Sequence, residues 1–404
     1  MYKIVNQWQI AFHETILDIK PPEKIKIRHE KYFKMPVYTK SGGYNNGVVL
    51  KQLEACGCTL TNGLIPSSLV VKTGKGTLLT RGKDYEFDAV WGTIGRIPSS
   101  NISEFSEVYI DYDYIPMRID SIVLNSLSKI EILEGKNASY CPPLPALRKG
   151  DKRLMNILLT GKSSKLTPKD CYPILQNKIL IPRQDPMQSF LPNTMNKLKS
   201  GGKLKILAWG DSVTDGLYIA PRFHWQQQFF TALKRIYPKH DIELMSLGWG
   251  GRCTKTFLDE PESSIYNFKE KVLNSGADLV ISEFVNDAGL FPEIWAKCYT
   301  DIFNQFKQKK IEWIICTPHY VRHDWMNCSG KTASEMEDDP RPFVAFLRKF
   351  AAENKIALAD PAKIYGQLYK TGIPYQTLMT NNINHPDQRG LKIYSDALLA
   401  IFKK

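Results

Sequence analysis

The spacing of apolar positions divides the chain into two parts with different rhythms. In residues 1 to about 185, short apolar runs are separated by Gly and polar turns, and residues 107–114 alternate polar and apolar side chains. Alternation of this kind is typical of a strand with one buried face. Many short strands without long helices favour a sandwich-like fold. The sequence therefore predicts a β-rich accessory domain over residues 1–185, and it indicates no function for that domain.

After Lys203 short apolar runs alternate with longer stretches of helical periodicity. Strands are expected at 204–209, 242–247, 278–284, 311–316 and 356–359. Helices are expected at 222–236, 264–275, 293–309, 342–354 and 388–402. This alternation predicts a parallel sheet covered by helices on both faces. With right-handed crossovers it becomes a five-stranded, doubly wound, flavodoxin-like α/β domain over residues 203–404, with its ligand crevice at the carboxyl ends of the strands.

Residues 186–202 separate the two rhythms and are expected to form a linker. Pro186 and Pro192 lie near its start, and Gly201 and Gly202 end it. Proline and glycine interrupt regular structure, so they are typical of connecting segments. A short helix is expected inside the linker, near residues 194–199.

Composition and charge narrow the class of protein. Apolar residues make up 43% of the 404-residue chain and charged residues 24%, which is ordinary for a globular protein with a sizeable core. No apolar run approaches the length of a membrane helix, so no membrane partner is expected. The N-terminus lacks the apolar core of a signal peptide, which predicts a cytoplasmic protein if the chain is complete and a periplasmic or secreted one if a leader was removed. The net charge is +13, but Lys and Arg are scattered, so a basic surface is expected and nucleic-acid binding is not.

Cysteine and histidine spacing gives no sign of a metal site. Of the eight cysteines, only Cys56 and Cys58 are close in sequence, and no second pair with zinc-ligand spacing exists. The seven histidines form no HxH pattern, and the one HxxxH pair, His319 and His323, supplies too few ligands for a metal site by itself. No phosphate-binding glycine loop follows the first strand of the α/β part. We therefore expect buried free thiols, no metal and no cofactor.

Polar residues of different chemical types follow the predicted strands. Gly210-Asp211-Ser212 follows the first strand, residues 248–251 (Gly-Trp-Gly-Gly) follow the second, and Asn286-Asp287 follows the third. Residues 382–385 (Asn-Ile-Asn-His) precede the last helix. Since the carboxyl ends of parallel strands share one edge of the sheet, these segments are expected to meet there.

The order of these residues resembles the SGNH, or GDSL-type, hydrolase family over roughly residues 203–404. The resemblance implies that Ser212, at a strand-to-helix turn, is the nucleophile and that His385 is its general base. It also implies an oxyanion hole made by the backbone N–H groups of Ser212 and Gly251 and the side-chain amide of Asn286. Asp211 is expected to hold the turn through its carboxylate.

Two positions depart from the family pattern. Val285 replaces the glycine of the GxND block, and Asn382 replaces the aspartate of the DxxH block. Asparagine accepts a hydrogen bond from an imidazole but supplies no negative charge. Three arrangements remain open: a Ser–His dyad oriented by Asn382 or by a backbone carbonyl, a carboxylate supplied by another loop, or a catalytically weak domain that keeps the pocket for binding. The candidate carboxylates are Glu283, Asp324, Asp338 and Asp339.

Aromatic residues near the expected crevice point to the substrate. Trp249 and Trp325 can stack on sugar rings, whereas Trp209 ends a strand and suits the core. The long loop 319–341 is not markedly apolar, unlike the lid expected of a lipase. We therefore expect an esterase that removes acetyl or another small acyl group from a carbohydrate. The alternatives are an inactive carbohydrate-binding module and an enzyme of the lipase or lysophospholipase type.

Overall fold

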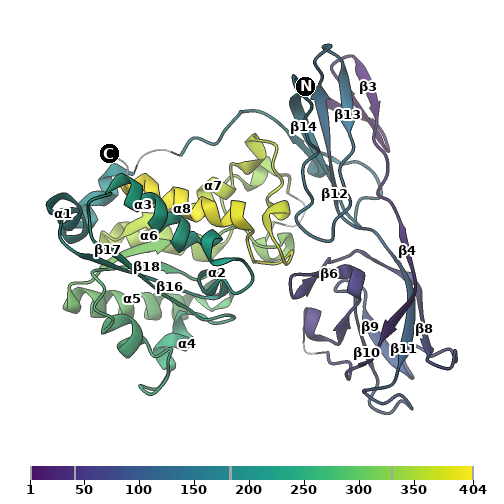
Figure 1. Cartoon of the computed structure of the whole chain (residues 1–404), viewed down its shortest axis with the longest axis horizontal. Coiled ribbons are helices and arrows are strands. Elements are labelled where there is room, and N and C mark those ends of the chain that lie inside the picture. Colours follow the sequence, from purple (N-terminus) through teal and green to yellow (C-terminus); the bar gives the residue numbers. More distant parts are fainter. Residues whose placement is uncertain (1, 41, 182–183, 329–330, 403–404) are drawn as a thin grey trace. The chain divides into compact units, whose positions relative to one another are not determined.

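The computed structural model describes residues 2–40, 42–181, 184–328 and 331–402. They form two compact units (Figure 1). The first unit consists of Met1–Asn177 and Tyr369–Ile383, and the second consists of Lys178–Leu368 and Asn384–Lys404. The sequence predicted one boundary near residue 185 and an uninterrupted C-terminal domain, so the structure differs in both respects.

The segment Tyr369–Ile383 leaves the second unit and packs within the first. Ile174 forms an antiparallel bridge with Thr371, and the side-chain amide of Asn156 donates to the carbonyl of Gly372 at 2.6 Å. The latter contact joins residues 216 positions apart. Pairing over such a separation leaves no periodic pattern in either segment, which is why the sequence did not reveal it.

The first unit is built from short strands. They are β1 (Tyr2–Asn6), β2 (Gln9–Phe12), β3 (Thr15–Asp18), β4 (Ile25–Tyr32), β5 (Val48–Val49), β6 (Glu54–Ala55), β7 (Cys58–Thr59), β8 (Leu64–Thr73), β9 (Tyr85–Asp88), β10 (Thr93–Arg96), β11 (Val108–Tyr114), β12 (Arg118–Leu124), β13 (Ile130–Leu133), β14 (Lys152–Leu159) and β15 (Cys171–Pro173). Two separate apolar cores hold them. Ile10 and Ile157 belong to one core, and Val71 and Ile110 belong to the other. The predicted β-rich character is confirmed, with sheets packed around two cores.

The second unit contains a five-stranded parallel sheet, as the alternation of strands and helices predicted. Its order is β17-β16-β18-β19-β20, which places β17 at one edge. The strands are β16 (Leu204–Gly210), β17 (Ile242–Gly248), β18 (Leu279–Glu283), β19 (Glu312–Cys316) and β20 (Ala357–Ala359). The helices are α1 (Pro192–Ser200), α2 (Ser212–Asp215), α3 (Trp225–Ile236), α4 (Thr254–Asp259), α5 (Pro292–Lys309), α6 (Pro342–Asn354), α7 (Pro361–Tyr365) and α8 (Gln388–Phe402).

Helices cover both faces of this sheet (Figure 1). On one face, aromatic residues of α4, α5 and α6 share a core with Leu207 and Trp209 of β16. On the other face α3 and α8 lie side by side, and the rings of Phe229 and Phe402 are 5.6 Å apart. The helices cover the faces of the sheet and leave the carboxyl ends of its strands to the loops that follow them. Among the described residues, no helix is both long and apolar enough to cross a membrane.

Two local predictions differ from the structure. The expected helix over 264–275 is only a π-helical turn, Lys269–Leu273, and a turn that Ser264 N–H closes onto the carbonyl of Pro261 precedes it. Residues 186–202 were expected to be a linker. The short helix expected inside it is present as α1, a 3-10 helix (Asp185–Phe190) precedes it, and Leu191 and Leu198 are fully buried. Apolar burial makes this segment part of the second unit.

Candidate active site

Ser212 lies at the turn between β16 and α2. Asp211 caps the helix by accepting a hydrogen bond from Val213 N–H at 3.0 Å, and its other oxygen accepts from Asn286 N–H at 3.0 Å. The carboxylate is completely buried. It therefore ties the serine turn to the loop after β18, the scaffold role expected of Asp211. Gly210 is required before it, because a Cβ there would lie 2.2 Å from Thr214 Oγ1.

His385 lies in the loop before α8, within reach of the serine. Its Nε2 is 3.0 Å from Oγ of Ser212. Burial lowers the pKa of His385 from its ordinary value of 6.5 to about 4. The imidazole is therefore neutral at pH 7 and can accept a proton from the hydroxyl. These two residues, 173 positions apart in the chain, form a pair suited to general-base activation of an alcohol.

Tyr218 completes the surroundings of the imidazole. Its ring is stacked on that of His385, with centroids 4.3 Å apart and planes inclined by 8°. The sequence did not single out Tyr218. A tyrosine in a loop after a short helix carries no periodic or motif signal, so only the fold shows what it contacts.

Gly251 and Asn286 lie on the two loops that adjoin the serine turn. Gly251 has φ +72°, a left-handed conformation that favours glycine, and no atom lies within 4 Å of where its Cβ would be. The side-chain amide of Asn286 donates one hydrogen bond to the carbonyl of Arg252 at 3.0 Å. A Cβ on Gly250 would lie 3.9 Å from Cβ of Ser212, so the glycine loop packs directly beside the nucleophile turn.

Asn382 makes its hydrogen bonds within the first unit. Its amide nitrogen donates to the backbone carbonyls of Thr59 and Ser139, at 3.3 and 2.8 Å, and all three residues belong to the first unit. These bonds engage the amide nitrogen, whereas orienting His385 would require the amide oxygen as an acceptor. That Asn382 orients His385 therefore stays a prediction.

Three of the four carboxylates considered as substitutes are engaged in other contacts. Asp339 is buried and paired with Arg341, and Asp324 forms an ion pair with Arg322. Asp338 is exposed. Glu283 is fully buried and is 3.4 Å from Thr214 Oγ1 and 3.3 Å from the hydroxyl of Tyr394. The contacts of Asp324, Asp339 and Glu283 thus account for the positions of three of the four candidates without the imidazole.

Three buried carboxyl groups, those of Asp211, Glu283 and Asp287, lie beneath the loops that form the site. Burial raises the pKa of Asp211 and of Asp287 to about 7, and burial together with the neighbouring Asp211 raises that of Glu283. Asp287 accepts hydrogen bonds from Thr254 N–H at 2.8 Å and from the hydroxyl of Tyr299 at 3.0 Å. Such groups hold backbone in place because a buried acceptor left unpaired is costly.

The three tryptophans considered near the crevice differ in exposure. Trp209 is fully buried in edge contact with Phe284, so it belongs to the core. Trp249 stacks on Tyr266 at 4.1 Å. Trp325 is 50% exposed, and the guanidinium of Arg322 lies over its ring, 5.6 Å from the centroid.

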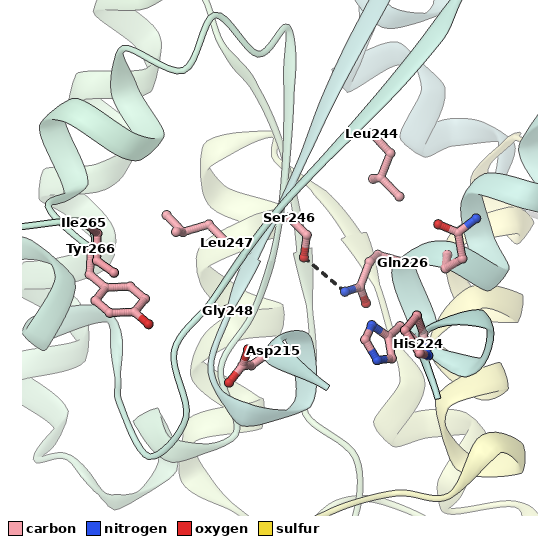
Figure 2. Close-up of a pocket in the computed structure, with 11 residues that line it drawn as sticks. Asp215, His224, Gln226, Leu244, Ser246, Leu247, Gly248, Ile265 and Tyr266 are labelled. Atoms are coloured by element: carbon pink, nitrogen blue, oxygen red, sulfur yellow. Dashed lines mark hydrogen bonds between the residues drawn. The ribbon is translucent and has the colours of Figure 1, made fainter. Parts of the chain in front are cut away.

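A pocket of about 530 Å³ adjoins the serine helix along the edge strand β17 (Figure 2). Asp215, the last residue of α2, lies in its wall, together with His224, Gln226 and Ser246. Gln226 donates to Ser246 Oγ at 3.1 Å, the bond drawn in Figure 2. The remaining lining residues are Pro221, Gln227, Leu244, Leu247, Gly248, Ile265 and Tyr266. Carboxylate, amide, hydroxyl and imidazole groups thus face a space large enough for a small ligand.

Within the described ranges, no cluster of three or more His, Cys, Asp or Glu side chains could hold a metal ion. No family model matches the sequence, and no curated protein matches it.

Several solved structures resemble this chain over about half of its length. One is a two-domain esterase (CEX) active on acetylated mannans, with 16% identity and a TM-score of 0.41 over 53% of this chain and 54% of that one. The chain thus spans about half the length of that esterase. Another is the acetyl xylan esterase AlAXEase, with 19% identity and a TM-score of 0.39 over 48% and 98% of the two chains. A third is a putative lipolytic protein of the G-D-S-L family from Desulfitobacterium hafniense DCB-2, with 17% identity and a TM-score of 0.38 over 49% and 99%.

Proposed function

We propose that the second unit is a serine hydrolase of carboxylic esters. The observation that carries the proposal is the 3.0 Å contact between Ser212 Oγ and His385 Nε2 at the carboxyl end of a parallel sheet. A serine hydroxyl is a weak nucleophile unless a neutral base accepts its proton as it attacks. His385 is such a base because burial keeps its pKa below neutrality.

The chemistry follows the usual two steps of acyl transfer. Ser212 Oγ bonds to the ester carbonyl carbon while its proton passes to Nε2 of His385. The backbone N–H groups of Ser212 and Gly251 and the second N–H of the Asn286 amide would bind the oxyanion. When the tetrahedral intermediate collapses, the C–O bond to the alcohol breaks and the imidazolium protonates the leaving oxygen. Water, activated by the same imidazole, then releases the acid from Ser212.

We infer a Ser–His dyad without a carboxylate, since Asp324 and Asp339 are paired with arginines and Glu283 lies against Thr214 and Tyr394. The negative charge of a triad carboxylate stabilises the imidazolium, so a dyad without it is expected to be slow. A slow esterase and a binding module that has kept the fold differ in one measurable respect, which is covalent reaction at Ser212.

We further propose that the substrate is a carbohydrate carrying acetyl or another small acyl group. The pocket beside α2 presents Asp215, Gln226, Gln227 and Ser246, which can exchange hydrogen bonds with sugar hydroxyls. An acyl chain would offer these polar groups no hydrogen-bond partner of its own. The half-exposed ring of Trp325 adds a face on which a sugar could stack.

A fluorophosphonate probe tests the chemistry. We expect it to label the protein, and Ser212→Ala to abolish both labelling and hydrolysis of p-nitrophenyl acetate. Ser275→Ala is the matched control, because Ser275 donates to Val272 carbonyl, distant in sequence from the site segments. Labelling that survives Ser212→Ala would overturn the proposal. A preference for long-chain esters over acetylated oligosaccharides would replace the carbohydrate substrate with a lipid one.

A further inference from the structure

Tyr218 and Ser212 hold the imidazole of His385 from two directions. Ser212 Oγ meets the ring edge at Nε2, and the Tyr218 ring lies against the ring face at 4.3 Å with an inclination of 8°. An edge contact leaves the imidazole able to rotate about the Oγ–Nε2 line, whereas a parallel neighbour fixes its plane. The two contacts hold the base at its edge and at its face.

The loop that carries Tyr218 is anchored to the serine helix. Gly216 closes α2 with φ +69°, and its N–H donates to the carbonyl of Ser212 at 3.0 Å. Nε2 of His224 lies 3.0 Å from the carbonyl of Gly216 and 3.1 Å from that of Ile219, and it donates to both. Hydrogen bonds therefore hold the turn that carries Tyr218 at residues before and after it. The stack is built into the same local structure as the nucleophile.

The stack also affects the protonation of His385. Burial makes protonation of His385 unfavourable, as its pKa of about 4 indicates. The face of an aromatic ring is electronegative, and it attracts a cation whose centre lies within about 6 Å. The separation of 4.3 Å falls inside this range. A tyrosine ring in this place therefore favours the imidazolium over the neutral imidazole.

We propose that Tyr218 is a positioning residue that fixes the plane of His385 and stabilises its protonated form through the ring face. The inference rests on the proposed hydrolase function. It concerns the step in which the Ser212 proton passes to Nε2 as Oγ bonds to the carbonyl carbon. The positive charge then lies on the imidazole until the leaving alcohol takes the proton. The ring face thus supplies part of the stabilisation that a carboxylate gives in a Ser-His-Asp triad.

Fluorinated phenylalanines at position 218 test the proposal without changing the shape of the ring. Fluorine withdraws electrons from the ring face, so a series from Phe through one, two and three fluorines weakens the attraction stepwise. We expect kcat for p-nitrophenyl acetate to fall along the series and KM to stay constant. Tyr218→Leu, which has no ring face, should lower kcat by about 2- to 30-fold, and Tyr218→Phe should retain most activity.

The pKa of His385, followed by NMR of its ring, should fall along the same series. A purely structural role predicts that neither kcat nor this pKa changes with fluorination, and that result would overturn the proposal. Leu217→Ala is the matched control, since Leu217 is the preceding residue and its side chain is 88% exposed. If Tyr218→Leu does not fold, the fluorinated phenylalanine series still tests the proposal. Failure of the fluorophosphonate probe to label Ser212 would instead reject the hydrolase function, so the two failures are distinguishable.

Discussion

The pH dependence of the activity should reveal that the catalytic base is buried. The proposed reaction needs a neutral His385, so kcat/KM falls as the pH drops through the pKa of this residue in the free enzyme. An ordinary imidazole titrates near 6.5, whereas burial lowers the pKa of His385 to about 4. Nearby His319 is also buried, and burial together with the neighbouring Arg341 lowers its pKa well below the ordinary value. The acid limb of the profile is expected about 2.5 units below the ordinary position.

The size of the expected change in activity follows from this difference between the two pKa values. At 1.36 kcal/mol per pKa unit, burial disfavours the imidazolium by about 3.4 kcal/mol. At pH 5, a base with a pKa of 4 is about 90% neutral, whereas one with a pKa of 6.5 is about 3% neutral. The enzyme should therefore keep about 30 times more of its activity at pH 5 than an exposed histidine would allow.

The assay is hydrolysis of p-nitrophenyl acetate between pH 3.5 and 8, followed at the isosbestic wavelength of the product. His385→Gln gives the background at each pH. Because the unfolded chain protonates His385 near 6.5 and the folded chain only near 4, this residue makes folding less stable as the pH falls through that window. Circular dichroism at each pH, and recovery of activity on return to pH 7, separate unfolding from titration. If the acid limb of the profile lay near pH 6.5 while the enzyme stayed folded, the imidazole would be solvated, and the prediction would be refuted.

Three further substitutions test other features of the structure. Trp209→Ala removes a fully buried ring from the core and should lower the free energy of unfolding by about 3–5 kcal/mol in urea; a loss below 1 kcal/mol would contradict its placement. Gly251→Ala should be destabilising by about 1–2 kcal/mol because φ is +72°, and an unchanged midpoint would mean that the loop adopts another conformation. Asn382→Asp should not raise kcat, and it should destabilise the fold by about 1–3 kcal/mol, since it sets a carboxylate oxygen against two carbonyls. A large gain in kcat would instead show that position 382 acts on His385.

The sequence by itself determined the architecture of the second unit. Runs such as 204–209 and 242–247 are apolar and short, and the stretches between them have helical periodicity. Only a parallel sheet with helices on both faces buries both kinds of segment. The five strands accordingly lie close to their predicted ranges, although the helix expected over 264–275 reduces to one π-helical turn. The β-rich character of the first unit followed in the same way from alternation within strands.

The tertiary structure decided what no local pattern encodes. The excursion of Tyr369–Ile383 depends on pairing with residues about 200 positions away, and it turns Asn382 toward Thr59 and Ser139. The stack of Tyr218 on His385, and the burial that lowers the pKa of the imidazole, likewise arise where distant segments meet. Periodicity reports which face of a segment is buried, because burial acts on each residue through its own side chain. Which groups meet in the folded chain, and in what dielectric, depends on all the segments at once.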